Sequence, residues 1–91
     1  MLLDYTKDFQ AKYNRSPDTF GGHAWDAIQL VVKAMEKAGT DKAKIRDEIE
    51  NMKDFVGISG VFNMSAQDHN GLTPDAFAMI EVKDGKWTRA E

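Results

Sequence analysis

Apolar residues recur every three or four positions through the first half of the chain, which indicates helices. In residues 2–14, Leu2, Tyr5, Phe9 and Tyr13 stand three and four positions apart, the spacing of one helical face. Residues 14–17 end this segment, because the residue before a proline is disfavoured in helical geometry. We therefore expect an amphipathic helix with an aromatic stripe.

The strongest helical pattern covers residues 23–38. One face carries Ala24, Ala27, Ile28, Val31, Met35 and Ala38, widened by Leu30, Val32 and Ala34. A face this apolar predicts a helix that is largely buried against a sheet or against other helices. Either Asp18 or Thr19 is a suitable cap, and Gly21 and Gly22 leave the exact start open. Gly39 is a natural terminator.

A third helix is expected over residues 41–52, capped by Thr40 or Asp41. Its apolar stripe, Ile45, Ile49 and Met52, is narrow, and the remaining positions are mostly charged. This pattern is typical of a helix on the outside of a domain.

After Phe55 the helical period ends. Gly57 and Gly60 bracket a turn, and Asp84-Gly85 is a β-hairpin signal. Strands are expected at residues 61–64, 77–82 and 86–88, with a loop over 65–74. The predicted class is α/β, or α+β for these residues alone: three helices, then a short strand and a C-terminal hairpin. We expect a single partial domain over 1–91, with a helical part, 1–55, and a β-rich tail, 56–91.

Composition limits the function classes. The chain has 91 residues, 42% hydrophobic and 30% charged, with a net charge of −3, which is ordinary for a soluble domain. No basic stripe exists, so nucleic-acid binding is not expected. Cysteine is absent, which excludes disulfides and cysteine metal sites. We also expect no cofactor, no membrane-spanning segment and no signal peptide in these residues.

The order of these elements resembles the C-terminal part of the type I periplasmic binding proteins, in the branched-chain amino acid (leucine/isoleucine/valine) class. The resemblance is carried by an apolar helix opening with Trp25-Asp26-Ala27, then the glycine turn and strand of residues 55–62, Asp68-His69-Asn70-Gly71, and a strand and turn at 82–87. Trp25 stands where tyrosine is commoner in the family, and Ser59 where threonine is commoner. The likeness covers essentially the whole chain, although no single motif is specific.

The resemblance implies a non-enzymatic receptor of an ABC importer. Such a receptor has two α/β lobes that close around a small amino-acid-like or carboxylate ligand and then engage a membrane permease. It implies a periplasmic or extracellular parent, with a lipoprotein anchor as one option. Most of that fold lies outside these residues. We therefore expect the isolated chain to be an oligomer, or to be bound to the rest of its parent.

The best candidate for ligand contact is Phe20-Gly21-Gly22, directly before the long helix. Glycines at a helix start let a ligand carboxylate approach free N–H groups, and Phe20 offers an aromatic surface. The resemblance places this segment at the cleft wall of the first lobe. The alternative, more common for such segments, is that the glycines are loop residues and Phe20 belongs to the core.

His23 and Asp26 are three positions apart, so a base and its orienting carboxylate is one interpretation. No serine or cysteine nucleophile sits at a motif spacing, and we expect Asp26 to be a structural hydrogen-bonding residue. Asp68-His69 is interpreted as a polar turn in which Asp68 bonds backbone N–H groups ahead of Gly71. Neither pair has the spacing of a metal site.

Gly57 and Gly60 are expected to adopt backbone angles that other residues tolerate poorly. The resemblance places their turn near an inter-lobe crossover, which suggests a hinge. Gly85 is assigned a structural role in the hairpin, and Trp25 and Trp87 are expected to be packing residues.

Three functions are compatible with these patterns: a solute receptor or a piece of one, a small stand-alone interaction module that dimerises through its apolar helix, and an enzyme using a His/Asp pair. The ordered resemblance favours the first.

Overall fold

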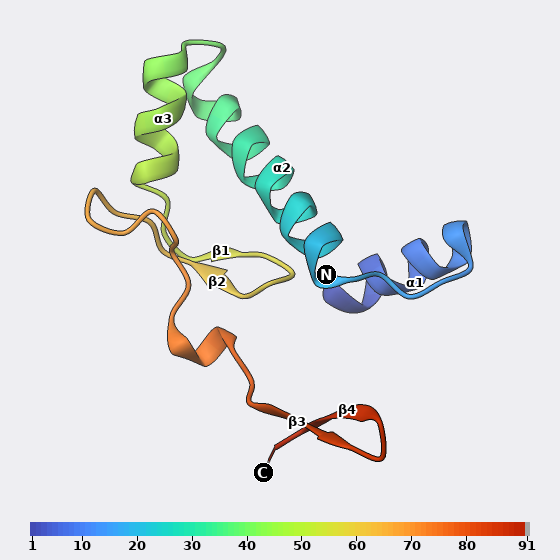
Figure 1. Cartoon of the computed structure of the whole chain (residues 1–91). Coiled ribbons are helices and arrows are strands. Elements are labelled where there is room, and N and C mark those ends of the chain that lie inside the picture. The colour runs from blue at the N-terminus through green and yellow to red at the C-terminus, as the bar shows by residue number, and fades with distance from the viewer. Residues whose placement is uncertain (91) are drawn as a thin grey trace.

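The computed structural model describes residues 1–90 and contains three α-helices and two small antiparallel hairpins (Figure 1). The helices are α1 (Leu2–Tyr13), α2 (Thr19–Ala38) and α3 (Lys42–Glu50). They are followed by β1 (Phe55–Val56), β2 (Val61–Phe62), a short 3-10 helix η1 (Pro74–Ala76), β3 (Ile80–Lys83) and β4 (Lys86–Arg89). The predicted fold class is confirmed, and β1 is an additional short strand that the sequence pattern did not indicate.

Carboxylate caps set the starts of the two later helices. The Asp18 side chain accepts a hydrogen bond from the Gly21 N–H at 2.8 Å, so α2 begins at Thr19 and runs through both glycines. Asp18 was one of the two predicted caps, and the helix start that the two glycines had left open lies at Thr19. Asp41 caps α3 in the same way, accepting from the Lys44 N–H at 3.0 Å. In both helices the cap satisfies an N–H group that has no partner within the helix.

The core lies between α2, α3 and the β1–β2 hairpin. Its buried members are Leu30, Ala34, Met52, Phe55, Phe62 and Met64, with Ile45, Ile49 and Leu72 packed against them. Phe55 and Phe62 are directly paired across the two strands, with ring centroids 6.1 Å apart. The apolar stripe of α3 thus meets the core while its charged side faces solvent, as predicted.

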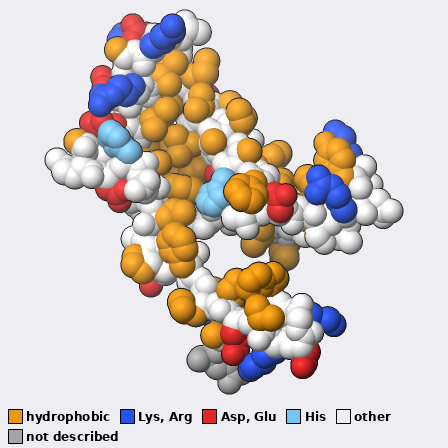
Figure 2. All heavy atoms as spheres, in the orientation of Figure 1, with side chains coloured by type: hydrophobic (Ala, Val, Ile, Leu, Met, Phe, Trp, Pro, Cys, Tyr) orange, Lys and Arg blue, Asp and Glu red, His pale blue; other side chains and the backbone are white. Residues whose placement is uncertain are grey.

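The buried face of α2 agrees with the predicted one only at Leu30 and Ala34, which were expected to widen it. Its buried residues are Gly22, Asp26, Leu30 and Ala34, one row at a spacing of four. Predicted face residues Ile28, Val31, Val32 and Met35 remain exposed, as does Trp25, and we call these five residues the exposed apolar face of α2. Figure 2 shows many hydrophobic side chains open on the visible surface. Burial follows the available partners, and the described residues fully cover only one side of α2.

The β3–β4 hairpin stands apart from the helices (Figure 1). Its two strands contact chiefly each other. Asp84 and Gly85 form the connecting turn with φ of 51° and 72°, as the Asp-Gly signal predicted. The strand begins at Ile80 rather than at Phe77, since Phe77 follows directly on η1. Trp87, expected to be a packing residue, pairs with Val82 but is 74% exposed.

The molecule is extended for its length. Its radius of gyration is 15.9 Å, against about 12 Å for a compact domain of this size. Its accessible surface is 7389 Å², against about 5,300 Å² for a compact monomer of the same mass. Among residues 1–90, no helix combines the length and hydropathy needed to span a bilayer.

Candidate functional site

Asp26 fastens the β1–β2 loop to the first half of α2. Its side chain is 2% exposed. Its Oδ1 accepts a hydrogen bond from the Ile58 N–H at 2.6 Å, and its Oδ2 accepts one from the Ser59 N–H at 2.8 Å. Hydrogen bonds to an ionised acceptor are shorter and stronger than neutral ones. Asp26 therefore fixes, on α2, a loop that lies more than thirty positions away in the sequence.

Gly57 is required by the close approach of this carboxylate. Its φ is not positive, so the expectation that it adopts an angle reserved for glycine was wrong. A β-carbon built on Gly57 would instead lie 2.7 Å from Asp26 Cγ and 2.8 Å from both carboxylate oxygens. Gly22 is also close to the loop, with its β-carbon position 3.4 Å from Ile58 Cγ2. The two glycines let α2 and the loop meet.

His23 joins the same loop from the exposed side. Its Nδ1 lies 3.0 Å from Ser59 Oγ. A catalytic base would need Asp26 on one ring nitrogen and a nucleophile on the other. Here Asp26 bonds backbone N–H groups, and the Ser59 hydroxyl faces Nδ1. This arrangement orients the imidazole ring but does not build a nucleophile–base–carboxylate series.

A cleft of about 470 Å³ opens beside this junction. Apolar walls come from the start of α1, from the β1–β2 loop and from the segment around η1, and polar groups come from the start of α2. The lining residues that matter most here are Tyr5, Asp18, His23, Ile58, Ser59, Leu72 and Phe77. A hollow with mostly apolar walls and a few polar groups is typical of small-molecule sites.

The predicted ligand segment, Phe20-Gly21-Gly22, is only partly open. Phe20 is 85% exposed, so it is not a core residue of the described chain, and its ring is free for contact. The Gly21 N–H already bonds the Asp18 carboxylate and the Gly22 N–H bonds the Asp18 carbonyl. Both glycine N–H groups are occupied, and a ligand carboxylate would have to compete with Asp18. The role of Phe20 remains a prediction.

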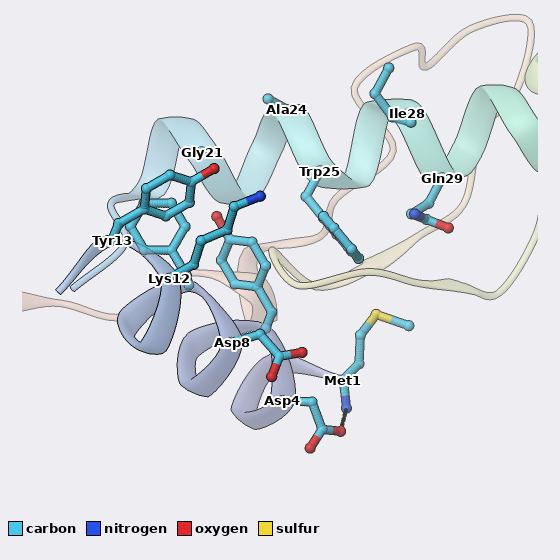
Figure 3. A pocket seen from close by; sticks show the side chains of 12 residues that line it. Met1, Asp4, Asp8, Lys12, Tyr13, Gly21, Ala24, Trp25, Ile28 and Gln29 are labelled. Carbon is cyan, nitrogen blue, oxygen red and sulfur yellow. Dashed lines mark ion pairs between the residues drawn. The ribbon is translucent and has the colours of Figure 1, made fainter. Parts of the chain in front are cut away.

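A second hollow, of about 660 Å³, lies between α1 and α2 (Figure 3). Tyr5, Phe9 and Tyr13 follow one another along α1, and the Tyr5 ring lies 5.5 Å from that of Trp25. In Figure 3, Trp25 points from α2 toward α1. Trp25 thus packs in part on α1, as expected, although the groove remains open to solvent.

Gly60 and Gly85 occupy different parts of the molecule. Gly60 has φ of 147°, and a β-carbon there would lie 3.0 Å from Leu72 Cδ2 and from Ala76 Cβ. The turn thus packs closely against the segment that leads to β3. Gly85 has no neighbour within 4 Å of its β-carbon position and serves the hairpin turn alone.

Asp68 forms the predicted polar turn. Its Oδ1 accepts hydrogen bonds from the N–H groups of Asn70 at 2.9 Å and Gly71 at 3.1 Å, and these two bonds, that of Gly71 first, lower the pKa of the carboxyl group. His69 turns away to Glu50, at 3.1 Å. Within residues 1–90, no three potential ligand side chains converge to hold a metal ion.

Sequence reasoning did not find the contact between His23 and Ser59. The turn containing Ser59 and the helix containing His23 were each identified, but nothing in either segment named the other as its partner. Asp26 supplied the only signal that this part of the helix meets another segment, because an acidic residue that a helix buries requires a hydrogen-bond donor.

The chain is similar in structure to part of several solved ligand-binding proteins. The leucine-binding protein LivK from Thermotoga maritima superposes with a TM-score of 0.77 at 24% identity, over 99% of this chain and 25% of LivK. An extracellular ligand-binding receptor from Rhodopseudomonas palustris HaA2 gives 0.75 at 32% identity, over 94% of this chain and 26% of the receptor. Another such receptor from Rhodopseudomonas palustris gives 0.70 at 26% identity, with coverages of 93% and 26%.

The chain spans about a quarter of the length of these structures. No curated protein matches it. The family model described as periplasmic binding protein matches residues 3–86, nearly the entire chain and all of the site described above. The chain therefore belongs to the periplasmic binding protein family.

Proposed function

We propose that this chain is the C-terminal part of a solute receptor that captures a small amino-acid-like or carboxylate ligand between two lobes. Its family membership and its likeness to ligand-binding receptors support a receptor. Its excess surface and its radius of gyration of 15.9 Å support a part whose packing partners lie elsewhere in a longer chain.

One observation carries the ligand-binding role of this part. Phe20 is 85% exposed at the start of α2, three positions before His23, which lines the cleft together with Ser59. A large aromatic side chain held out from a fixed helix offers a flat apolar surface at little further entropy cost. We assign Phe20 to the ligand-facing wall, while Gly21 and Gly22 serve the close packing of α2.

The receptor would act in the periplasm or outside the cell and would deliver its ligand to the membrane permease of an ABC importer. The matched LivK protein is a leucine-binding protein, so L-leucine is a natural first probe. Aromatic acids are a second class, because Phe20 suits an aromatic ligand as well as an aliphatic one.

The test uses the full-length receptor that carries this segment. Calorimetry and thermal shift against L-leucine, other apolar amino acids and aromatic acids should identify a ligand. Phe20→Ala should then weaken binding about tenfold or more, the loss of about 1.4 kcal/mol or more. Leu3→Ala, at a similarly exposed apolar position on α1, is the matched control and should leave the Kd unchanged. Equal effects of both substitutions would show that Phe20 does not contact the ligand.

A second function, a stand-alone interaction module, is favoured by the exposed apolar face of α2. The neighbouring coding sequence distinguishes the receptor from the interaction module. An upstream in-frame stretch with a signal peptide and further α/β segments supports the receptor, whereas its absence supports the module.

A further inference from the structure

The imidazole ring of His23 is held at one nitrogen and free at the other. Nδ1 lies 3.0 Å from Ser59 Oγ, and a serine hydroxyl can donate or accept, so this bond suits the neutral and the protonated ring. Within residues 1–90, the opposite nitrogen, Nε2, has no hydrogen-bond or ion-pair partner. The ring is oriented, yet one polar atom remains available.

The orientation of His23 depends on the buried carboxylate of Asp26. Asp26 fixes the Ser59 backbone through the 2.8 Å bond to its N–H group, and the bond to Ile58 prevents the loop from turning about a single contact. The position of Ser59 Oγ, and with it that of the imidazole, therefore depends on a carboxylate that is 2% exposed. A ligand-facing side chain supported in this way keeps its geometry at low entropy cost.

The surroundings suit a ligand with one anionic group and an apolar body. Ile58, Leu72 and Phe77 give the cleft beside His23 apolar walls. The exposed ring of Phe20 precedes His23 by three positions on α2 and so lies on the same side of the helix.

Few titratable groups share this cleft with His23. They are Tyr5 from α1 and Asp18 at the cap of α2, with Asp26 beneath the loop. The loop residues and the segment around η1 contribute none to the lining. The Asp18 carboxylate is already engaged by the Gly21 N–H. His23 is thus the one side chain lining this cleft that offers a ring nitrogen with no partner among residues 1–90.

We propose that His23 is a specificity-determining residue, donating a hydrogen bond from Nε2 to the carboxylate of the ligand while Phe20 contacts its apolar part. Asp26 and Ser59 are positioning residues that act through His23. This inference rests on the proposed receptor function and narrows the ligand class to monocarboxylates with an aliphatic or aromatic body. A carboxylate accepts a stronger hydrogen bond than a neutral amide does, so an acid should bind more tightly than its amide.

The test measures the Kd of the full-length receptor for acids and their amides: L-leucine with L-leucinamide, and benzoate with benzamide. The amide should bind about tenfold more weakly than the acid. His23→Ala, which removes the donor, should abolish most of this difference. His69→Ala, which changes the other histidine, on an exposed turn, is the matched control and should preserve it.

Ser59→Ala tests the positioning role. It keeps the imidazole but removes the bond to Nδ1, so the acid should bind several-fold more weakly and the acid-to-amide ratio should fall. If His23→Ala leaves the acid-to-amide ratio within about twofold of wild type, this inference is wrong and the receptor function stands. If none of the probes binds to the wild-type receptor, the proposed ligand class is wrong, and this inference is wrong with it.

Discussion

A β-carbon added to Gly57 would lie 2.7 Å from Cγ of Asp26, closer than two non-bonded carbon atoms can approach. The carboxylate cannot retreat, because it is buried and both of its oxygens are hydrogen-bonded to the next two residues of the loop. The space above Asp26 is therefore filled by the backbone of Gly57, and any side chain there must break the attachment of the loop to α2.

Gly57→Ala should destabilise the full-length receptor by about 1–3 kcal/mol, the usual cost of forcing extra atoms into a packed site. Denaturant unfolding monitored by circular dichroism measures this difference in the free energy of unfolding. Gly39→Ala is the comparison, since its β-carbon position has no neighbour within 4 Å and only its φ of 67° opposes the substitution. A smaller effect at position 57 than at position 39 would contradict the role given to Asp26.

Local signals in the sequence were sufficient for the helices and the final hairpin. The periodicity of Leu2, Tyr5, Phe9 and Tyr13 gave the extent of α1 nearly to the residue, because an amphipathic pattern and a following proline are both local properties. The Asp84-Gly85 turn was equally local. The sequence left the start of α2 open, and the Asp18 cap decides it because that cap outweighs the low helix propensity of two glycines.

The buried side of α2 could not be predicted in the same way. Ile28 and Val31 carry the stronger apolar signal, yet the described residues bury Leu30 and Ala34 instead. Which side is covered depends on where α3 and β1–β2 lie, and that is a property of the whole fold. The pairing of Ser59 with His23 escaped prediction for the same reason, since the two residues are 36 positions apart.

Gly60→Val should impair ligand capture by the full-length receptor. The new β-carbon would meet Leu72 and Ala76 at 3.0 Å, on the segment that links the helical body to the β3–β4 hairpin, and a β-branched residue is strained at φ of 147°. We expect ligand affinity to fall about tenfold or the ligand-induced compaction seen by small-angle scattering to diminish.

Gly39→Val is the control for backbone strain alone, because it has a positive φ but open space around it. If Gly60→Val leaves both the affinity and the scattering profile unchanged, the turn does not contribute to a hinge.

Acid should weaken the turn formed by Asp68. Its carboxyl pKa is lowered in the folded chain by bonds from the Gly71 and Asn70 N–H groups. A group whose pKa is lower folded than unfolded stabilises the fold above its unfolded pKa, and that contribution is lost as the pH falls through the folded value. The loss should therefore begin below about pH 4.

Asp68→Asn keeps an acceptor oxygen but cannot titrate. The difference in Tm between wild type and Asp68→Asn should be present at neutral pH and should shrink as the pH falls below about 4. Calorimetric melts across this range measure it. A difference that stays constant down to about pH 2 would show that the lowered pKa has no influence on stability.

The isolated chain should associate in solution, because residues 1–90 cover the exposed apolar face of α2 only in part, where Trp25 packs on Tyr5 of α1. Ile28 is 63% and Val32 47% exposed on that helix, and contiguous apolar surface of this kind drives association in water. Size-exclusion chromatography with light scattering should show a species larger than 10.2 kDa. Replacing Ile28 and Val32 together with lysine should shift the chain toward the monomer, whereas Ala43→Lys, on the exposed surface of α3, should not. A wild-type monomer with a cooperative melt would mean that this face needs no partner, and the case for a missing lobe would then rest on the structural comparisons alone.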